Sequence, residues 1–234
     1  MSTAGSSPWI RFLRTRTGWR LFLRAPRDPT GCCWDLKTKP MAERYVKNIR
    51  AFIAIPLPGD VRLLLTDLQY RLKKAGIKAS WPQPDRFHLT LKFLGETPCG
   101  HLAQIQKVMD QFSGQYPDLA LAAGSLGAFP KTNKARVLWA DIKGETRRLE
   151  QLYRKLDNSL QRIGIPGQTR PFSPHITLAR IKVPVSSHTL EDLIQAYAHQ
   201  WSDPFFPDCM ALYKSTLSAR GAVHTLMFQT KLGV

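Results

Sequence analysis

The sequence predicts an α/β fold made of two related lobes, and three observations support that prediction. A pattern of histidine, apolar residue, threonine and leucine occurs twice, as His88–Leu91 and His175–Leu178. An apolar, strand-like segment precedes each copy: Phe52 lies 36 residues before the first histidine, and Leu138 lies 37 residues before the second. Helix-like segments follow in the same order in both halves. Self-similarity with a spacing of 87 residues between the histidines indicates an internal duplication.

Residues 1–48 differ from the rest of the chain. They hold ten Lys and Arg against three Asp and Glu, with turn formers and no sustained hydrophobic period. We expect a basic, disordered extension. A transit peptide, a tail that grips RNA, and a gene-start artefact with Met41 as the working start are alternative interpretations. Residues 49–234 form the predicted domain, with lobes near 49–126 and 127–234 that could exchange strands.

The predicted elements repeat across the two lobes. In the first lobe, an apolar run ended by prolines predicts a strand, leucines at helical spacing predict a helix that Gly76 ends, and Gly95 closes the first histidine strand. The first-lobe elements are strand 51–55, a helix from 60 to 76, strand 86–95, a helix from 98 to 112 and strand 119–126. The second-lobe elements are strand 136–142, a helix from 144 to 160, the second histidine strand near 175–180, a helix near 190–197 and terminal strands 210–217 and 223–230.

The two histidine segments alternate polar and apolar residues, as half-buried strands do. Residues two apart in a strand share a face. His88 and Thr90 therefore share one face, and His175 and Thr177 share one in the second copy. If the lobes meet about a pseudo-twofold axis, both histidines can line one cleft. Two imidazoles, each beside a hydroxyl, suit paired acid–base chemistry on a phosphate, since the ordinary histidine pKa is near 6.5.

Composition limits the classes of partner and cofactor. The formal net charge of +17 favours a polyanion such as RNA, although a generally basic, solvated surface is the plainer interpretation. No apolar run approaches the length of a membrane helix, so no membrane association is expected. The four cysteines and six histidines match no common metal-ligand spacing, and no cofactor or metal is expected. The cysteine pattern favours a reducing compartment, the cytoplasm.

The motifs resemble those of the 2H phosphoesterase superfamily, and most closely those of the RNA 2′,3′-cyclic phosphodiesterases, once called 2′-5′ RNA ligases. The resemblance rests on four segments, covers about residues 49–234, and departs at His224, where many relatives are expected to have an aromatic residue such as tyrosine. The four segments are Phe52–Ile55, His88–Gly95, Arg136–Trp139 and Pro171–Arg180.

The resemblance implies two antiparallel sheets that face a central cleft, with helices outside. It also implies metal-independent hydrolysis of a terminal RNA 2′,3′-cyclic phosphate to a 2′-phosphomonoester. His88 is then the proton donor and His175 the proton acceptor, although the reverse reaction exchanges these roles. Thr90 and Thr177 would bind the phosphate oxygens. The expected partner is the end of an RNA or oligonucleotide, and the protein is expected to act as a monomer.

Other residues carry weaker signals. Arg180, at the end of its strand, is a candidate contact to the phosphate or the next nucleotide, and Phe172 is a candidate to stack on a base. Lys92 and Arg136 are weaker candidates for contacts to the RNA backbone, and each is equally explained as a solvated charge. A single half-buried histidine is usually structural; the duplicated context is what favours catalysis. The remaining histidines lack that context and are expected to be surface or local hydrogen-bonding groups. They are His101, His188, His199 and His224.

Two further functions use the same residues. Ligation to a 2′-5′ bond is the hydrolysis run backwards, with a hydroxyl in place of water. A nucleotide- or RNA-binding module without turnover is the alternative of another class. Both His-x-Thr pairs are complete, which argues against the module.

Overall fold

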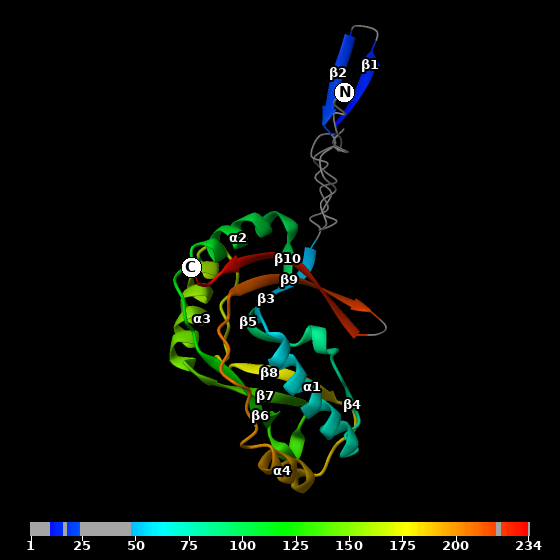
Figure 1. Cartoon of the computed structure of the whole chain (residues 1–234), viewed down its shortest axis with the longest axis vertical. Coiled ribbons are helices and arrows are strands. Elements are labelled where there is room, and N and C mark those ends of the chain that lie inside the picture. The colour runs from blue at the N-terminus through cyan, green and yellow to red at the C-terminus, as the bar shows by residue number, and fades with distance from the viewer. Residues whose placement is uncertain (1–9, 16–17, 24–47, 219–220, 234) are drawn as a thin grey trace, which may run out of the picture. The chain divides into compact units, whose positions relative to one another are not determined.

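The computed structural model describes residues 10–15, 18–23, 48–218 and 221–233. The chain divides into two compact units, Met1–Tyr45 and Val46–Val234. In the first unit, strands β1 (Ile10–Thr15) and β2 (Gly18–Leu23) pair as an antiparallel hairpin (Figure 1). The sequence analysis did not predict this hairpin. The rest of the expected disordered extension falls outside the described residues.

The second unit carries the duplicated pattern of strands and helices. Its first half contains β3 (Asn48–Pro56), α1 (Gly59–Lys74), β4 (Ala79–Ser80), β5 (His88–Pro98), α2 (Leu102–Asp110) and β6 (Leu121–Phe129). Its second half contains β7 (Val137–Gly144), α3 (Thr146–Gln161), β8 (His175–Ile181), α4 (Ser187–Ala196), β9 (Cys209–Ser218) and β10 (Gly221–Lys231). Three short 3-10 helices join these elements, η2 (Pro84–Arg86), η3 (Cys99–His101) and η4 (Thr132–Lys134). Within the described ranges, no helix is both long and apolar enough to cross a membrane.

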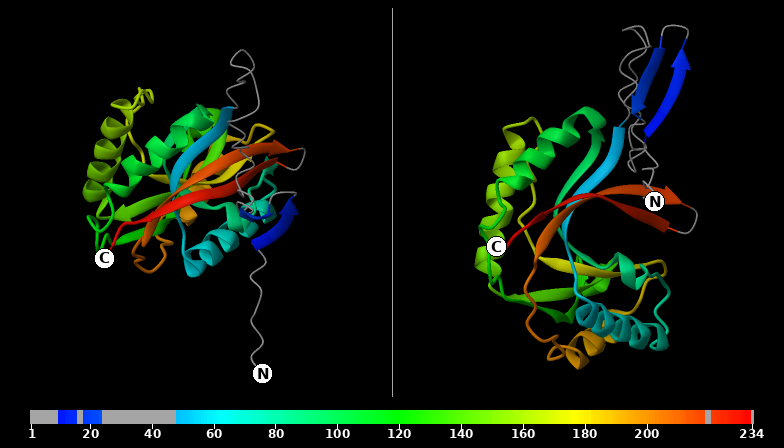
Figure 2. Two further views of the ribbon diagram at one scale, coloured as in Figure 1. Left: turned by 90° about the horizontal axis from the view of Figure 1, so that it is seen from above. Right: turned by 45° about the horizontal axis from the view of Figure 1, so that its top comes forward.

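Two four-stranded antiparallel sheets form the framework, which confirms the predicted fold class. One sheet has the order β10-β9-β3-β5 and the other the order β4-β8-β7-β6. The strands are therefore exchanged relative to the chain halves: β4 and β6 join the second sheet, and β9 and β10 join the first. The boundary expected near residue 126 consequently does not separate the sheets. Figure 2 shows α2 and α3 flanking one side of the unit.

The first histidine strand is longer than the sequence predicted. Gly95 was expected to end it, but β5 continues to Pro98 and pairs with β3 along its whole length. Gly95 has φ +71 and lies where the β3–β5 register shifts, so glycine absorbs an irregularity without ending the strand. Helix α2 accordingly begins at Leu102, after one 3-10 turn, and not at Pro98.

Each long helix supports the histidine strand of the other half. From α1, the side-chain amide of Gln69 donates to the carbonyls of Pro82 (3.1 Å) and Leu178 (2.7 Å), the latter in β8. From α3, Asp157 forms an ion pair with Lys92 of β5. Gln69 is 2% exposed and Lys92 is 1% exposed, so both contacts lie inside the protein. Buried polar groups are retained when their hydrogen bonds are made, and these contacts join the two halves.

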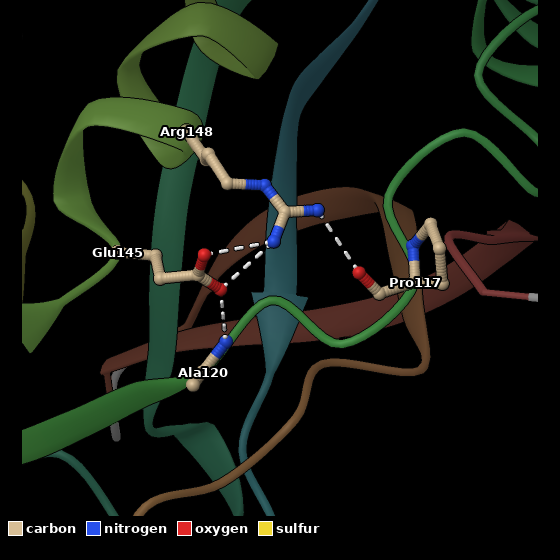
Figure 3. Close-up of polar contacts among 4 residues, drawn as sticks. All are labelled: Pro117, Ala120, Glu145 and Arg148. Atoms are coloured by element: carbon tan, nitrogen blue, oxygen red, sulfur yellow. Dashed lines mark hydrogen bonds and ion pairs between the residues drawn. The ribbon is translucent and has the colours of Figure 1, made fainter.

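A further polar cluster fixes the junction between β7 and α3 (Figure 3). Arg148 donates to both carboxylate oxygens of Glu145 (2.8 and 2.9 Å) and to the carbonyl of Pro117 (3.0 Å). The Glu145 carboxylate also accepts from the backbone N–H of Ala120 at 2.9 Å. The hydrogen bond from Arg148 is the largest cause that lowers the pKa of Glu145. Gly144 has φ +105, and a Cβ there would lie 2.4 Å from the Ala120 carbonyl oxygen, so this approach requires glycine.

Candidate active site

His88 begins β5 and is held from behind by its own chain. Its Nδ1 lies 2.7 Å from the carbonyl oxygen of Arg86. A carbonyl oxygen only accepts, so Nδ1 carries the hydrogen in the neutral ring and Nε2 keeps its lone pair. The ring packs against Phe52 at a centroid distance of 4.8 Å. Nε2 is therefore the nitrogen of the neutral His88 ring that can accept a proton.

His175 begins β8 in the same arrangement. Its Nδ1 lies 2.7 Å from the carbonyl oxygen of Ser173, again two residues earlier in the chain. Phe129 meets the ring edge-on at 5.1 Å and stacks on Trp139 at 4.9 Å. Gly127 lies opposite Trp139 in the β6–β7 ladder, where a Cβ would come within 2.2 Å of the indole. The absence of a side chain at Gly127 thus makes room for the aromatic wall beside His175.

The two histidine strands come from different sheets and contact each other. The positive charge that His175 can carry is one of the influences acting on His88. Thr90 and Thr177 are half-buried, as residues on a strand face beside a site should be. Each threonine follows its histidine by two residues on one strand, so each shares its histidine's face. The fold therefore brings the two His-x-Thr strands that the sequence pattern singled out into contact.

A pocket of about 120 Å³ adjoins His88 and contains residues that the sequence analysis missed. It is lined by Asp85, Arg86 and three rings, namely Phe52, Tyr213 and His224, together with the neighbouring residues Phe87 and Val223. His175 does not line this pocket.

The expectation for His224 was wrong. The sequence analysis assigned it to the surface or to local hydrogen bonding, but its ring meets His88 edge-on at 5.4 Å. Its buried Nδ1 has no hydrogen-bond partner among the described residues. Strand β10 carries His224 and pairs with β9, which in turn pairs with β3. This neighbour relation depends on strand exchange, and its one signal in the sequence was the departure from the family pattern at this position.

Burial lowers the pKa of His88 to about 4. The surrounding rings remove water from the imidazole, and the nearby imidazoles of His224 and His175 disfavour its positive form, while the Arg86 carbonyl acts in the opposite direction. The pKa of His224 is also lowered, first by burial and then by the Arg86 guanidinium. His88 is consequently neutral at pH 7 in the free protein.

Three of the candidate substrate contacts have different surroundings. Arg180 is exposed and lies opposite Val137 in the β7–β8 ladder. Arg136 is also exposed, but its carbonyl accepts from the N–H of Ile181, so it lies beside the opposite face of β8. Phe172 stacks on Tyr153 of α3, with centroids 4.3 Å apart and an interplanar angle of 8°. One face of Phe172 is therefore already covered.

Fold and site together define a class: an α+β protein with two sheets and a duplicated His-x-Thr strand at their meeting point. A family model described as LigT like phosphoesterase matches residues 55–139 and 141–223. These segments make up well over half of the chain. The chain belongs to the LigT-like phosphoesterase family.

Comparisons with individual proteins agree with this assignment. The RNA 2′,3′-cyclic phosphodiesterase of Methanocaldococcus jannaschii is 28% identical over 179 residues, covering 76% of this chain and 98% of the relative. The protein of the same name from Thermus thermophilus is 30% identical over 183 residues, covering 76% of this chain and 88% of the relative.

Solved structures share the fold. The crystal structure of TT0787 from Thermus thermophilus matches with a TM-score of 0.66 and 27% identity, over 79% of this chain and 98% of that one. The structure of E. coli LigT complexed with 3′-AMP matches with a TM-score of 0.61 over the same shares. Its identity of 24% shows the fold alone.

Proposed function

We propose that this protein hydrolyses the 2′,3′-cyclic phosphate at the end of an RNA and leaves a 2′-phosphomonoester. The observation that carries the proposal is the pair of His-x-Thr strands that meet from two sheets, each histidine held through Nδ1 by a backbone carbonyl. The printed names of the curated relatives describe the same activity. Both half-sites come from one chain, so a monomer contains the whole site.

In the proposed mechanism His175 is the base and His88 is the acid. The Nε2 of His175 takes a proton from water, and the water oxygen forms a bond to phosphorus. The bond from phosphorus to the ribose 3′ oxygen breaks, and protonated His88 gives its Nε2 proton to that oxygen. Each positioned acid or base contributes about 10²- to 10⁴-fold in rate. Both proton transfers are supplied by side chains, so the proposal needs no metal.

The phosphate itself helps to prepare the acid. His88 is neutral at pH 7 in the free protein, because burial lowers its pKa to about 4. A phosphodiester anion bound beside the ring favours the positive form and raises this pKa in the complex. The hydroxyls of Thr90 and Thr177 would donate to the non-bridging oxygens, where negative charge grows in the transition state. Arg180 is proposed to contact the substrate from the end of β8. Arg136 and Phe172 are not assigned such a role, given their surroundings.

An assay on a defined RNA end tests the proposal. We expect the protein to convert a short oligoribonucleotide ending in a 2′,3′-cyclic phosphate to the 2′-phosphomonoester, at the same rate with and without EDTA. Phosphate position can be read by chromatography against synthetic 2′- and 3′-phosphate standards. Loss of activity in EDTA would contradict the metal-free mechanism. Binding without conversion would instead support an RNA-binding module, and joining to a second RNA would support ligation.

The pH profile gives a second prediction. In kcat/KM the acidic limb should lie at about pH 4, because burial lowers the pKa of His88 in the free protein to that value. An acid with the lower pKa of an acid–base pair sets the acidic limb, since the rate rises with pH only until that acid begins to lose its proton. The substitution His224→Ala should admit water beside His88 and remove a neighbouring imidazole, so the limb should move to higher pH. The measurement is kcat/KM on the cyclic phosphate from about pH 3.5 to 8, a range that includes the lowered pKa of His88 and the ordinary histidine pKa. His199→Ala, an exposed histidine, is the control, and an unmoved limb in His224→Ala would refute the coupling.

A further inference from the structure

The polar face of β8 continues past Thr177 because the strand contains a β-bulge. Thr177 lies opposite Trp139 and Arg180 lies opposite Val137, whereas Leu178 has no partner in the ladder. Val137 and Trp139 are two residues apart and share a face, so Arg180 returns to the face of His175 and Thr177. We call this the histidine face of β8.

The bulge is a supported feature of the fold. The carbonyl of Leu178 is the group that the ladder would leave irregular, and it accepts a 2.7 Å hydrogen bond from the buried amide of Gln69. Leu178 itself is buried, as is Ala179, which faces the core beside it. Without the extra residue, Arg180 would point with the core-facing residues. The fold therefore holds a cation in line with the proposed phosphate site.

Two lysines extend this line of positive charge. Ser80 of β4 lies opposite Arg180, and the N–H of Lys182 donates to the carbonyl of Lys78 at 3.0 Å, which places Lys78 opposite Lys182. Lys182 lies one residue beyond the end of β8, but its hydrogen bond to Lys78 extends the β4–β8 ladder by one pair, so Lys182, two residues after Arg180, continues the histidine face. Lys78, Arg180 and Lys182 are all exposed, and none forms an ion pair with an acidic residue in the described part of the chain.

Like charges directly opposite each other on neighbouring strands destabilise a sheet. Lys78 and Lys182 lie one residue beyond the ends of β4 and β8, where one backbone hydrogen bond holds them opposite each other. An anion bound over these two lysines and Arg180 would reduce the repulsion between their like charges. The partners of Thr177 and Arg180 on β7, Trp139 and Val137, are two residues apart, so the bulge places Arg180 roughly 7 Å from Thr177 along the strand. An RNA chain whose last phosphate lies at Thr177 has its preceding phosphates within reach of these three cations, which we call the basic track.

We propose that the basic track binds the phosphates of the RNA strand that precedes the terminal cyclic phosphate. This inference rests on the proposed function and deepens it: the substrate class is an oligonucleotide, preferred over a cyclic mononucleotide. Contacts to phosphates carry no sequence code, so the preference is for chain length and not for base sequence. The contacts are electrostatic and weaken as salt displaces them.

The test compares two double variants of equal charge. In Lys78→Gln/Lys182→Gln the ratio of kcat/KM for an oligoribonucleotide 2′,3′-cyclic phosphate to that for a cyclic mononucleotide should fall about tenfold at low salt, as two exposed charge contacts allow. The dependence of log KM on log salt for the oligonucleotide should become shallower by about 1.4, or about 0.7 for each phosphate contact. The control is Lys107→Gln/Lys231→Gln, two exposed lysines on α2 and at the end of β10, which should keep the wild-type ratio.

Two results would overturn the proposal: an unchanged ratio in Lys78→Gln/Lys182→Gln, or an equal fall in both double variants, which would reflect net charge alone. The thermal midpoint of each variant checks that its fold is intact. If the double variant has a lowered midpoint, the single variant Lys182→Gln is used in its place. Fluorescence anisotropy with a labelled oligoribonucleotide that ends in a 2′-phosphate measures RNA binding to the basic track without turnover. If neither substrate is hydrolysed but this binding still weakens in the track variant alone, the proposed chemistry fails and the track stands.

Discussion

His88→Ala and His175→Ala are each expected to lower kcat on an RNA 2′,3′-cyclic phosphate by about 10²- to 10⁴-fold. The reason is that each ring supplies one of the two proton transfers, and each is preset by a 2.7 Å contact from Nδ1 to a backbone carbonyl. The double variant should be little worse than the poorer single variant, because groups that act as a unit are not additive. Single-turnover rates on a labelled oligonucleotide measure both effects.

The controls for this prediction separate chemistry from folding. His199→Ala removes an exposed histidine and should keep the wild-type rate. Both site rings are half-buried at the start of a strand, so their loss should move the thermal midpoint only slightly. A His88 or His175 variant that turns over at a near-normal rate would remove that residue from the mechanism.

Asp157→Ala is expected to be the most destabilising single substitution considered for this protein. It leaves the ammonium of Lys92 inside the protein with the carbonyl of Pro166, at 2.6 Å, as its remaining partner. Removing one partner of a buried ion pair costs about 3–5 kcal/mol of unfolding free energy. For a chain of this size, that loss corresponds to a fall in the thermal midpoint of about 6–20 °C. Urea unfolding and differential scanning calorimetry measure the two quantities.

The matched control removes both charges together. In Lys92→Met/Asp157→Leu, apolar side chains of similar volume fill the space, and replacing a whole buried pair in this way is often neutral or stabilising. Its stability should therefore lie much closer to that of the wild type than that of Asp157→Ala does. If the single and double variants were equally unstable, packing would be the source of the loss, and the ion pair would not be.

Much of this architecture could be predicted from the sequence because it depends on local periodicity. The run from Phe52 to Ile55 is apolar and ends at a proline, and the structure has β3 there. The leucines before Gly76 repeat at helical spacing, and α1 ends at Lys74. The predicted end of β5 at Gly95 was wrong because of a neighbouring strand. Strand β3 pairs with β5 on both sides of the irregularity at Gly95, so β5 continues past it.

Candidate site residues divide in the same way. His88 and His175 were found because their motif repeats within a strand pattern. His224 was misplaced because its position beside His88 depends on β9 and β10 joining the sheet of β3. His224 in β10 is 170 residues from Ala54 in β3 along the chain. Lys92 was a candidate for a contact to the RNA backbone or for a solvated charge, but it is 1% exposed and pairs with Asp157 of α3.

The sequence by itself determined where the long strands and helices of the second unit lie, and that two of the strands carry an imidazole and a hydroxyl on one face. Side-chain alternation and helical spacing are properties of a single segment, so they can be read in order along the chain. Only the tertiary structure decided which strands share a sheet, which ring stands beside His88, and that a bulge at Leu178 turns Arg180 toward the histidine face. Those outcomes depend on hydrogen bonds and packing between distant segments, and no local pattern encodes them.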